Sequence, residues 1–348
     1  LMPTGDDKEI DILHSELEKR FGKVKKNHGM FTHFGMQVLQ DLTTKDVTFD
    51  QAKYIHELLP IEISKSKGRT QDAKLEAQEQ TDFRSLACGI AWLALTSPVA
   101  QAAASMLQGM LGELTVKSAR VANEILDYLQ KNYTPLKLLG SHLRGKKLRL
   151  VSFSDSSFAN RSGKYCQGAY VIFVCAEEPD SKLYGTCVPA SWRSTKSKRV
   201  AVSTLVAETL ALTGACERGM ELQEFFHEIF CSTASPKALL NVSSESMLPL
   251  DVVVDCEDLE KALLAPVHHV SNKSLNIYIA ALRHDLMTGR IRSVCWCDTE
   301  DMIANCLTKI DLRGAEPIIL GNMLQAMRDN EIVMKSPYKV QGLSLIHI

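Results

Sequence analysis

Apolar residues in the first part of the chain recur mainly at helical spacing. They do so over residues 8–21, where Gly22 then offers a stop, and over residues 83–107 and 111–129, which are rich in alanine. A repeat close to 3.6 residues is typical of a helix with one buried face. We therefore predict a helix near the start and a packed helical pair further on, with an interruption at Pro98.

Between these helices the pattern indicates a strand pair and a connector. Residues 31–41 and 48–59 read as two strands followed by a short helix, which Asp50 could cap. Residues 64–80 are polar and charged, with few large apolar side chains. Because such a composition buries little apolar surface, it predicts an exposed linker.

After residue 145 the pattern changes to short β-rich runs. Three of them predict antiparallel strands, and the later, fully apolar run LDVVV at 250–254 predicts a buried strand. A helix after Asp255 implies a parallel crossover, and the whole order is β-β-β-α-β-α-β-α. Gly219 allows a break in the helix predicted at 200–230, and we expect irregular structure after residue 328. The remaining predicted elements are strands at 148–155, 167–175, 183–192 and 290–297 and helices at 274–288, 300–308 and 314–328.

Composition is that of a globular protein. With 348 residues, of which 45% are hydrophobic and 23% charged, the chain is long enough for two domains with buried cores. No apolar run reaches the ~20 residues that span a bilayer, and the first residues lack a signal-peptide pattern, so we expect an intracellular protein, cytoplasmic or nuclear, without membrane contact. Ten cysteines lie in mostly apolar surroundings, as at Cys88, Cys175 and Cys216, which predicts buried free thiols.

The net charge of −1 provides no overall basic field for nucleic acid, so any such binding must come from local basic runs. The run WRSTKSKR contains Arg193, Lys196, Lys198 and Arg199. Two interpretations remain open for these side chains: contacts with phosphates, or a solvated basic loop whose charges need no partner.

Three acids and one amide stand where a polar site could form. Asp155 and Asp255 each close an apolar strand, and Glu208 lies within an otherwise apolar helix. Asn305 lies in the segment TEDMIANCLTK. A carboxylate at the end of a buried strand is unfavourable unless something pairs with it. Taken singly, however, each acid is explained as simply by a turn, a helix cap or an exposed helix position.

Four segments that contain these residues follow one another along the chain. They are VSFSDSSFA, SWRSTKSKRVAVSTLVAETLALTGA, VVDCEDLEKAL and DTEDMIANCLTK, at residues 151–159, 191–215, 253–263 and 298–309. Together they resemble the ribonuclease H domain of copia-type retrotransposons, and several linked motifs in order are more specific than any one of them. The resemblance implies an α/β fold, with a ribonuclease H-like mixed sheet flanked by helices and a mainly helical region before it.

The resemblance also implies a catalytic site. Asp155, Glu208 and Asp255 would bind metal, and Asn305 would occupy a degenerate fourth position. The implied cofactors are two Mg²⁺ ions, or Mn²⁺, and the implied partner is an RNA–DNA hybrid whose RNA strand is hydrolysed during reverse transcription. Two such ions can activate a water and stabilise the leaving 3′ oxygen, and Mg²⁺ prefers hard oxygen ligands.

Two departures from the family pattern lower the expected activity. The family has an aspartate where this chain has Asn305, and a neutral amide weakens the site of the second metal ion. Asp301, one turn earlier on the predicted helix, could compensate. A later helix carries Asn276, Ala280 and Ala281 where the family often has an acid and histidines. We expect hydrolysis to be reduced or lost and hybrid binding to be retained.

Upstream segments extend the resemblance. FTHFGMQVLQD, FDQAKYIHELL and DFRSLACGIAWLALTSPVAQAAASML resemble the thumb and connection of a copia-type reverse transcriptase. The palm motif is absent, because Gly5-Asp6-Asp7 precedes a helix instead of lying in an apolar hairpin, so we expect no polymerase activity and a missing palm and fingers as partners. The predicted organisation is a post-palm fragment at 1–63, a linker at 64–81, a helical thumb or connection at 82–140, a ribonuclease H-like domain at 146–312 and a C-terminal helix and tail at 313–348.

Some alternatives stay open. The chain could be a catalytically decayed, nucleic-acid-binding relic of a retrotransposon polyprotein, which would show no Mg²⁺-dependent cleavage. A nuclease with the same fold that acts on DNA is less favoured, because the upstream segments resemble a retroelement. Residues 343–348, LSLIHI, resemble a translated sequencing adapter, and we expect them to lie outside the fold.

Overall fold

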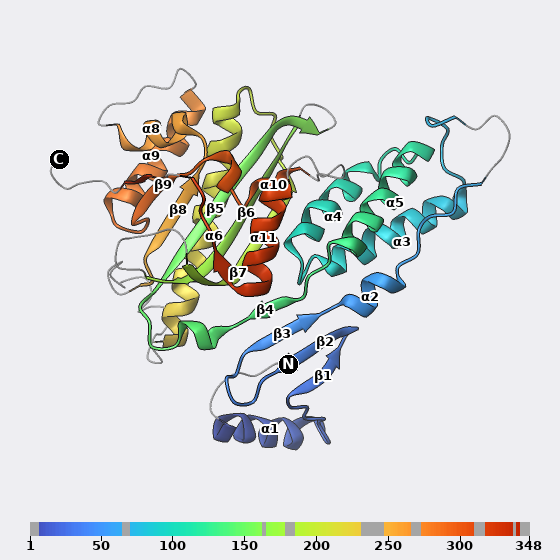
Figure 1. The fold of residues 1–348 in the computed structure, drawn as a ribbon, viewed down its shortest axis with the longest axis horizontal. Helices are drawn as coiled ribbons and strands as arrows, with labels where there is room; N and C mark the ends of the chain where they lie inside the picture. Colours follow the sequence, from blue (N-terminus) through green and yellow to red (C-terminus); the bar gives the residue numbers. More distant parts are fainter. Residues whose placement is uncertain are drawn as a thin grey trace.

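The computed structural model describes residues 7–64, 70–161, 165–177, 185–230, 247–265, 273–309, 317–336 and 339–341. Figure 1 shows one wide sheet with helices on both faces, the helices α3, α4 and α5 beside it, and a smaller sheet near the N-terminus. Within the described ranges, no helix combines the length and apolar character that crossing a membrane requires.

The smaller sheet joins the N-terminal segment to a strand far along the chain. Its strands are antiparallel in the order β1-β2-β3-β4, and Phe49 on β3 lies opposite Leu136 on β4. Asp50 accepts a hydrogen bond from Ala52 N at 2.7 Å just before α2, but the N-cap is Gln51, so Asp50 is not the cap that the sequence predicted. The elements of this part are α1 (Asp7–Phe21), β1 (Met30–His33), β2 (Met36–Gln40), β3 (Val47–Asp50), α2 (Ala52–Glu57) and β4 (Leu136–Leu138), followed by η1 (Gly140–Leu143).

Three helices replace the predicted helical pair. Pro98 begins a helix instead of interrupting one, since the first position of a helix needs no backbone N–H donor. The polar segment predicted as a linker ends earlier than expected, because Glu76 and Glu79 form a capping box from which α3 starts. The helices are α3 (Ala77–Leu93), α4 (Pro98–Met110) and α5 (Val116–Lys131).

The wide sheet has the strand order β10-β7-β6-β5-β8-β9-β11. β5, β6 and β7 are antiparallel neighbours, whereas β8 runs parallel to β5 and β9 parallel to β8. This is the predicted ribonuclease H-like mixed sheet, with its three antiparallel strands and its parallel crossover. The strands are β5 (Leu148–Arg161), β6 (Tyr165–Ala176), β7 (Gly185–Lys196), β8 (Leu250–Val254) and β9 (Ser293–Trp296).

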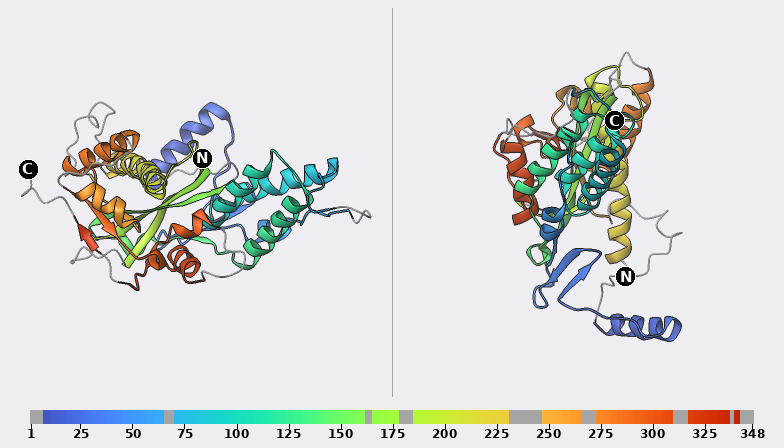
Figure 2. Two further views of the ribbon diagram at one scale, coloured as in Figure 1. Left: turned by 90° about the horizontal axis from the view of Figure 1, so that it is seen from above. Right: turned by 90° about the vertical axis from the view of Figure 1, so that its right-hand side faces the viewer.

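Helices cover both faces of this sheet (Figure 2). α6 runs past Gly219 without the break that the sequence had allowed. A Cβ at that position would lie 2.7 Å from Leu250 Cδ2, so the glycine permits close packing of α6 on β8. The predicted helix at 300–308 is two separate short turns. The helices are α6 (Thr204–Phe230), α8 (Glu257–Leu264), α9 (Lys273–Met287), η4 (Thr299–Asp301), α10 (Asn305–Thr308) and α11 (Pro317–Asp329).

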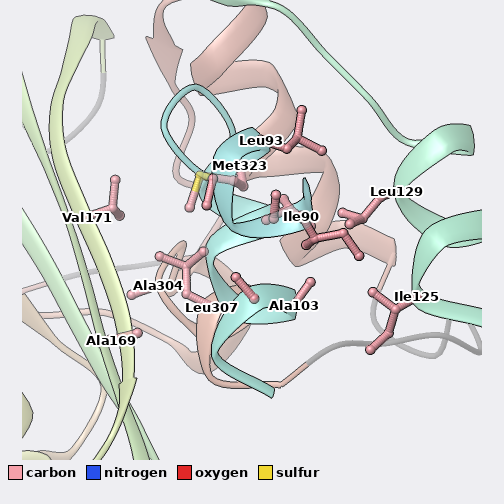
Figure 3. Close-up of a cluster of buried hydrophobic side chains, with 14 of the residues drawn as sticks. Ile90, Leu93, Ala103, Ile125, Leu129, Ala169, Val171, Ala304, Leu307 and Met323 are labelled. Atoms are coloured by element: carbon pink, nitrogen blue, oxygen red, sulfur yellow. The ribbon is translucent and has the colours of Figure 1, made fainter. Parts of the chain in front are cut away.

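One hydrophobic core joins the sheet to the upstream helices. Figure 3 shows Val171 from the sheet, Leu307 from α10 and Ile90 from α3 in the same buried cluster. Trp192 Nε1 on β7 also donates to Ala94 O at 3.0 Å. The opposite face of the sheet packs against α6, α8 and α9 in a second cluster. α4 is therefore packed directly onto β7, and the end of α3 is tied to the same strand through Trp192.

Two predictions about individual segments were wrong. The C-terminal segment is not wholly irregular, because β10 (Glu331–Ile332) pairs with β7 and β11 (Lys339–Gln341) pairs with β9, which covers both edges of the sheet. Residues 343–348 lie outside the described residues.

Cys88 is exposed and not buried as predicted, because the helical period turns Leu86 and Ile90 into the core instead. The nine described cysteines are all free, as predicted.

Candidate active site

The predicted carboxylates Asp155, Glu208 and Asp255 meet at one end of the wide sheet, and we call them the carboxylate cluster. Asp155 lies on β5, and Asp255 directly follows β8. These two strands are parallel and pair at Phe153 and Val253, so both aspartates lie at the same level on adjacent strands. Glu208 reaches them from the first turns of α6, and one carboxylate oxygen from each acid lies within 4.8 Å of the others.

Two acids of the cluster are buried, the third is half-buried, and their charges repel one another. Only 6% of Asp155 and 5% of Glu208 is exposed to solvent. Burial and the neighbouring charge of Asp255 raise the pKa of Asp155 to about 6. Burial and the charges of both aspartates raise the pKa of Glu208 to about 9, and burial also raises the pKa of Asp255. Without a cation, the cluster therefore retains protons that isolated carboxyls would lose.

Hydroxyl groups hold two of the three carboxylates in place. Thr308 Oγ1 on α10 donates to Asp155 Oδ2 at 2.5 Å, and Thr299 Oγ1 donates to Asp255 Oδ2 at 3.0 Å. Both threonines belong to the last of the four sequence motifs, but the sequence offered no sign of this role. These contacts fix the direction of each carboxylate before any ligand binds.

The donor set fits a hard divalent cation. Three carboxylates supply only oxygen ligands, and Mg²⁺ or Mn²⁺ completes its shell with water or phosphate oxygens. A bound cation would also balance the charges that raise the pKa values of Asp155 and Glu208. Asp155, Glu208 and Asp255 are the residues that would hold it.

Asn305 lies at the start of α10, one turn before Thr308, whose hydroxyl binds Asp155. It is buried, and its backbone oxygen accepts a hydrogen bond from Thr308 Oγ1 at 3.0 Å. Asp301 does not compensate for the missing acid as the sequence had allowed. Its carboxylate accepts hydrogen bonds from the backbone N–H groups of Lys335 and Ser336, because η4 and α10 are separate turns and not one helix.

The basic residues expected to bind phosphate lie at the same end of the sheet as the cluster. Lys196, at the end of β7, lies opposite Gln167 on β6. Gln167 lies opposite Ser157 on β5, two residues beyond Asp155. Arg193 is three residues earlier on β7 and is exposed. The strand register thus brings this basic segment to the level of the carboxylates.

Aromatic side chains hold two of the basic residues. Lys196 Nζ lies 4.3 Å from the centre of the Tyr165 ring. Arg199 Nη1 donates to Tyr278 Oη at 2.8 Å, which links the loop after β7 to α9. Lys198 is exposed. The loop before α6 is therefore tied to α9, while Lys198 and Arg199 remain exposed.

Lys309 is a charged residue of this site that the sequence did not single out. It follows Thr308 directly, is exposed, and its positive charge lowers the pKa of each acid in the carboxylate cluster. The only available signal was its place as the last residue of the motif DTEDMIANCLTK.

Solved structures of ribonuclease H and of a reverse transcriptase are similar to this chain. A crystal structure of LC11-RNase H1 in complex with an RNA/DNA hybrid has 15% sequence identity and a TM-score of 0.29, and the match covers 46% of this chain and 93% of that chain. A structure of LC11-RNase H1 isolated from compost by a metagenomic approach has 16% identity and a TM-score of 0.25, over 40% and 76% of the two chains.

The third structure is the native prototype foamy virus protease-reverse transcriptase, with 12% identity and a TM-score of 0.28, over 52% of this chain and 21% of that chain. No protein-family model matches the chain, and no curated protein matches its sequence. Identities and TM-scores this low say nothing about substrate, so the geometry of the site must support the function.

Proposed function

We propose that this chain hydrolyses the RNA strand of RNA–DNA hybrids with two divalent cations, Mg²⁺ or Mn²⁺, bound by Asp155, Glu208 and Asp255. The observation that supports the proposal is the buried cluster of three carboxylate oxygens within 4.8 Å of one another. A folded protein gains nothing from burying three like charges together unless a cation joins them. The cluster is therefore best explained as a metal site.

When bound, such cations activate a water and stabilise the leaving 3′ oxygen of a phosphodiester. The residues of the chain orient the ligands for this chemistry. Thr308 and Thr299 hold the carboxylates of Asp155 and Asp255 in place by hydrogen bonds. Glu208 adds a third carboxylate oxygen from α6. All three acids must be deprotonated to bind a cation, so cation binding releases protons near neutral pH.

We infer that the hybrid lies over the end of the sheet that carries both the cluster and the basic segment. Arg193, Lys196, Lys198 and Arg199 would contact phosphates there. Because an RNA–DNA hybrid is close to A-form, it presents 2′-hydroxyls across a wide and shallow minor groove, which distinguishes its RNA strand from DNA. Recognition would then depend on backbone shape and not on base sequence.

We also propose that the chain derives from a copia-type retrotransposon polyprotein. The support is the order of the four motifs and the packing of the thumb- or connection-like helices onto the ribonuclease H-like sheet. The domain boundaries stated above, and a palm and fingers supplied elsewhere, are part of this proposal. Asn305 should make hydrolysis slower than in a site with four acids, since it adds no negative charge for a second cation.

A cleavage assay tests the proposed function. The purified chain and its Asp155→Asn variant are incubated with a labelled RNA–DNA hybrid in Mg²⁺, in Mn²⁺ and in chelator. We expect cation-dependent cleavage of the RNA strand by the native chain only. Asp258→Asn is a matched control, because Asp258 is an exposed acid of α8 outside the cluster. Absence of cleavage by the native chain together with cleavage by Asn305→Asp would identify a decayed relic, and absence in both would overturn the proposal.

A further inference from the structure

Lys309 is held at the carboxylate cluster by the residue before it. Thr308 binds Asp155 through its hydroxyl at 2.5 Å, and its carbonyl oxygen accepts a hydrogen bond from Ser157 Oγ at 3.2 Å. Asp155 and Ser157 are both on β5. Two contacts therefore anchor the end of α10 to the strand that bears the central carboxylate, and the backbone of Lys309 begins directly beyond this anchor.

The side chain of Lys309 is close to the cluster without being bound by it. It is exposed, and its ammonium forms no hydrogen bond or ion pair with any residue that the structure describes. Its backbone directly follows Thr308, whose hydroxyl binds Asp155 at 2.5 Å, so the ammonium lies at the end of a side chain that starts beside the cluster. An ordinary charge-compensating lysine would pair directly with one of these carboxylates, and this one remains available to another anion.

We propose that Lys309 is a substrate-binding residue, whose ammonium contacts a backbone phosphate of the nucleic acid where that phosphate meets the carboxylate cluster. This inference rests on the proposed function. A phosphate that approaches three carboxylates is repelled by them, and an ammonium beside the cluster offsets that repulsion together with the bound cation. A lysine acts here as a flexible point charge and needs no particular base sequence.

Hybrid binding by a non-cleaving chain provides the test. The variants Asp155→Asn and Asp155→Asn with Lys309→Gln are compared by fluorescence anisotropy with a labelled RNA–DNA hybrid at several salt concentrations. We expect Lys309→Gln to weaken binding about three- to tenfold and to reduce the slope of log affinity against log salt by about one. Lys309→Arg should restore most of the affinity, since it retains the positive charge.

Two further measurements separate this role from others. Lys131→Gln removes a lysine from the end of α5, where it pairs with Asp127, and should leave the salt slope unchanged. Calorimetric titration of Mn²⁺ into the chain without nucleic acid should show equal or tighter cation binding in Lys309→Gln, because a neighbouring positive charge has been removed. A loss of Mn²⁺ affinity would mean that Lys309 supports the metal site instead, and would overturn the inference.

The outcomes distinguish this inference from the function on which it rests. If Asp155→Asn binds the hybrid and the added Lys309→Gln changes neither affinity nor salt slope, only the role of Lys309 is wrong. If Asp155→Asn does not bind the hybrid at all, the proposed function and the inference both fail.

Discussion

Strands β5 and β8 carry charged side chains at two ends of the same sheet face, and the two ends differ in charge balance. At one end Asp251 accepts from Arg149 Nη1 at 3.2 Å and from Arg292 Nε at 2.9 Å, while Arg292 also pairs with Glu177. Two positive groups there meet two negative ones. At the other end the carboxylate cluster brings three acids together, and no described arginine or lysine forms an ion pair with them. The charges at the first end are balanced by one another, whereas the second end gathers acids without a paired base among the described residues.

The physical difference lies in what each buried charge contacts. Arg149 and Asp251 are 1% and 2% exposed, and their burial is tolerable because each has a partner of opposite charge. In the cluster Asp155 and Glu208 are 6% and 5% exposed and Asp255 is half-buried, and among the described residues their carboxylates accept from hydroxyl and backbone donors and from no arginine or lysine. Charge balance therefore distinguishes the paired network around Asp251 from the carboxylate cluster that we propose as the active site.

The largest expected effect is on catalysis. Asp155→Asn removes the central charge of the cluster and should lower the rate of Mg²⁺-dependent cleavage by at least about 10³-fold, measured as the initial rate on a labelled RNA–DNA hybrid. Its stability to urea should match or exceed that of the native chain, because a repelling charge has been removed. Full activity in this variant would mean that the cluster is not the active site.

The opposite end should respond in stability. Asp251→Asn removes the carboxylate that pairs with both Arg149 and Arg292. We therefore expect a loss of about 3–5 kcal/mol in the free energy of unfolding, measured by urea denaturation. The exposed Asp258→Asn serves as a control and should change stability by less than about 0.5 kcal/mol. A loss of under 1 kcal/mol in Asp251→Asn would remove the distinction between the two ends.

The pH dependence of stability sharpens the comparison further. The pKa of Glu208 rises from 4.5 to about 9 in the folded chain, so the folded state binds more protons than the unfolded state between these values. The metal-free chain should therefore lose stability as pH rises through this window. Glu208→Gln should flatten that dependence and stabilise the metal-free chain by about 1–3 kcal/mol near neutral pH.

Thermal unfolding in chelator at several pH values measures this effect. Mg²⁺ should raise the melting temperature of the native chain, since it binds only the folded state, and should raise that of Glu208→Gln less. An identical pH profile in the two proteins would show that Glu208 does not carry the unbalanced charge.

The smallest effect is expected at the fourth position. Asn305→Asp should tighten Mn²⁺ binding and raise the cleavage rate, each by about three- to tenfold, because it adds a hard charged ligand near the cluster. Calorimetric titration and the cleavage assay measure the two changes. Asn305→Ala is the control that removes the amide without adding charge. Equal metal affinity in Asn305→Asp and the native chain would place residue 305 outside the metal site.

Local patterns along the chain were enough to predict most elements of the wide sheet, whereas the resemblance of the four linked motifs to a ribonuclease H domain singled out Asp155, Glu208 and Asp255. The runs ending at Asp155 and Asp255 alternate or remain apolar because their faces are buried, and that burial is visible in the sequence itself. The same reasoning placed Glu208 on a helix. The predictions were wrong where one residue type is compatible with two local structures. Gly219 permits close packing instead of a break, and Pro98 starts a helix instead of interrupting one.

What the sequence determined by itself is the periodicity of each element and the identity of the chemical groups at its ends. Only the tertiary structure decided which of these groups share a site, because contacts between distant residues depend on strand register and helix packing. Packing brought Glu208 to Asp155, committed Asp301 to the backbone of Lys335, and placed Lys309 beside three acids. The parallel register of β5 and β8 also set a balanced ion network at one end and an unbalanced one at the other, which no local pattern encodes.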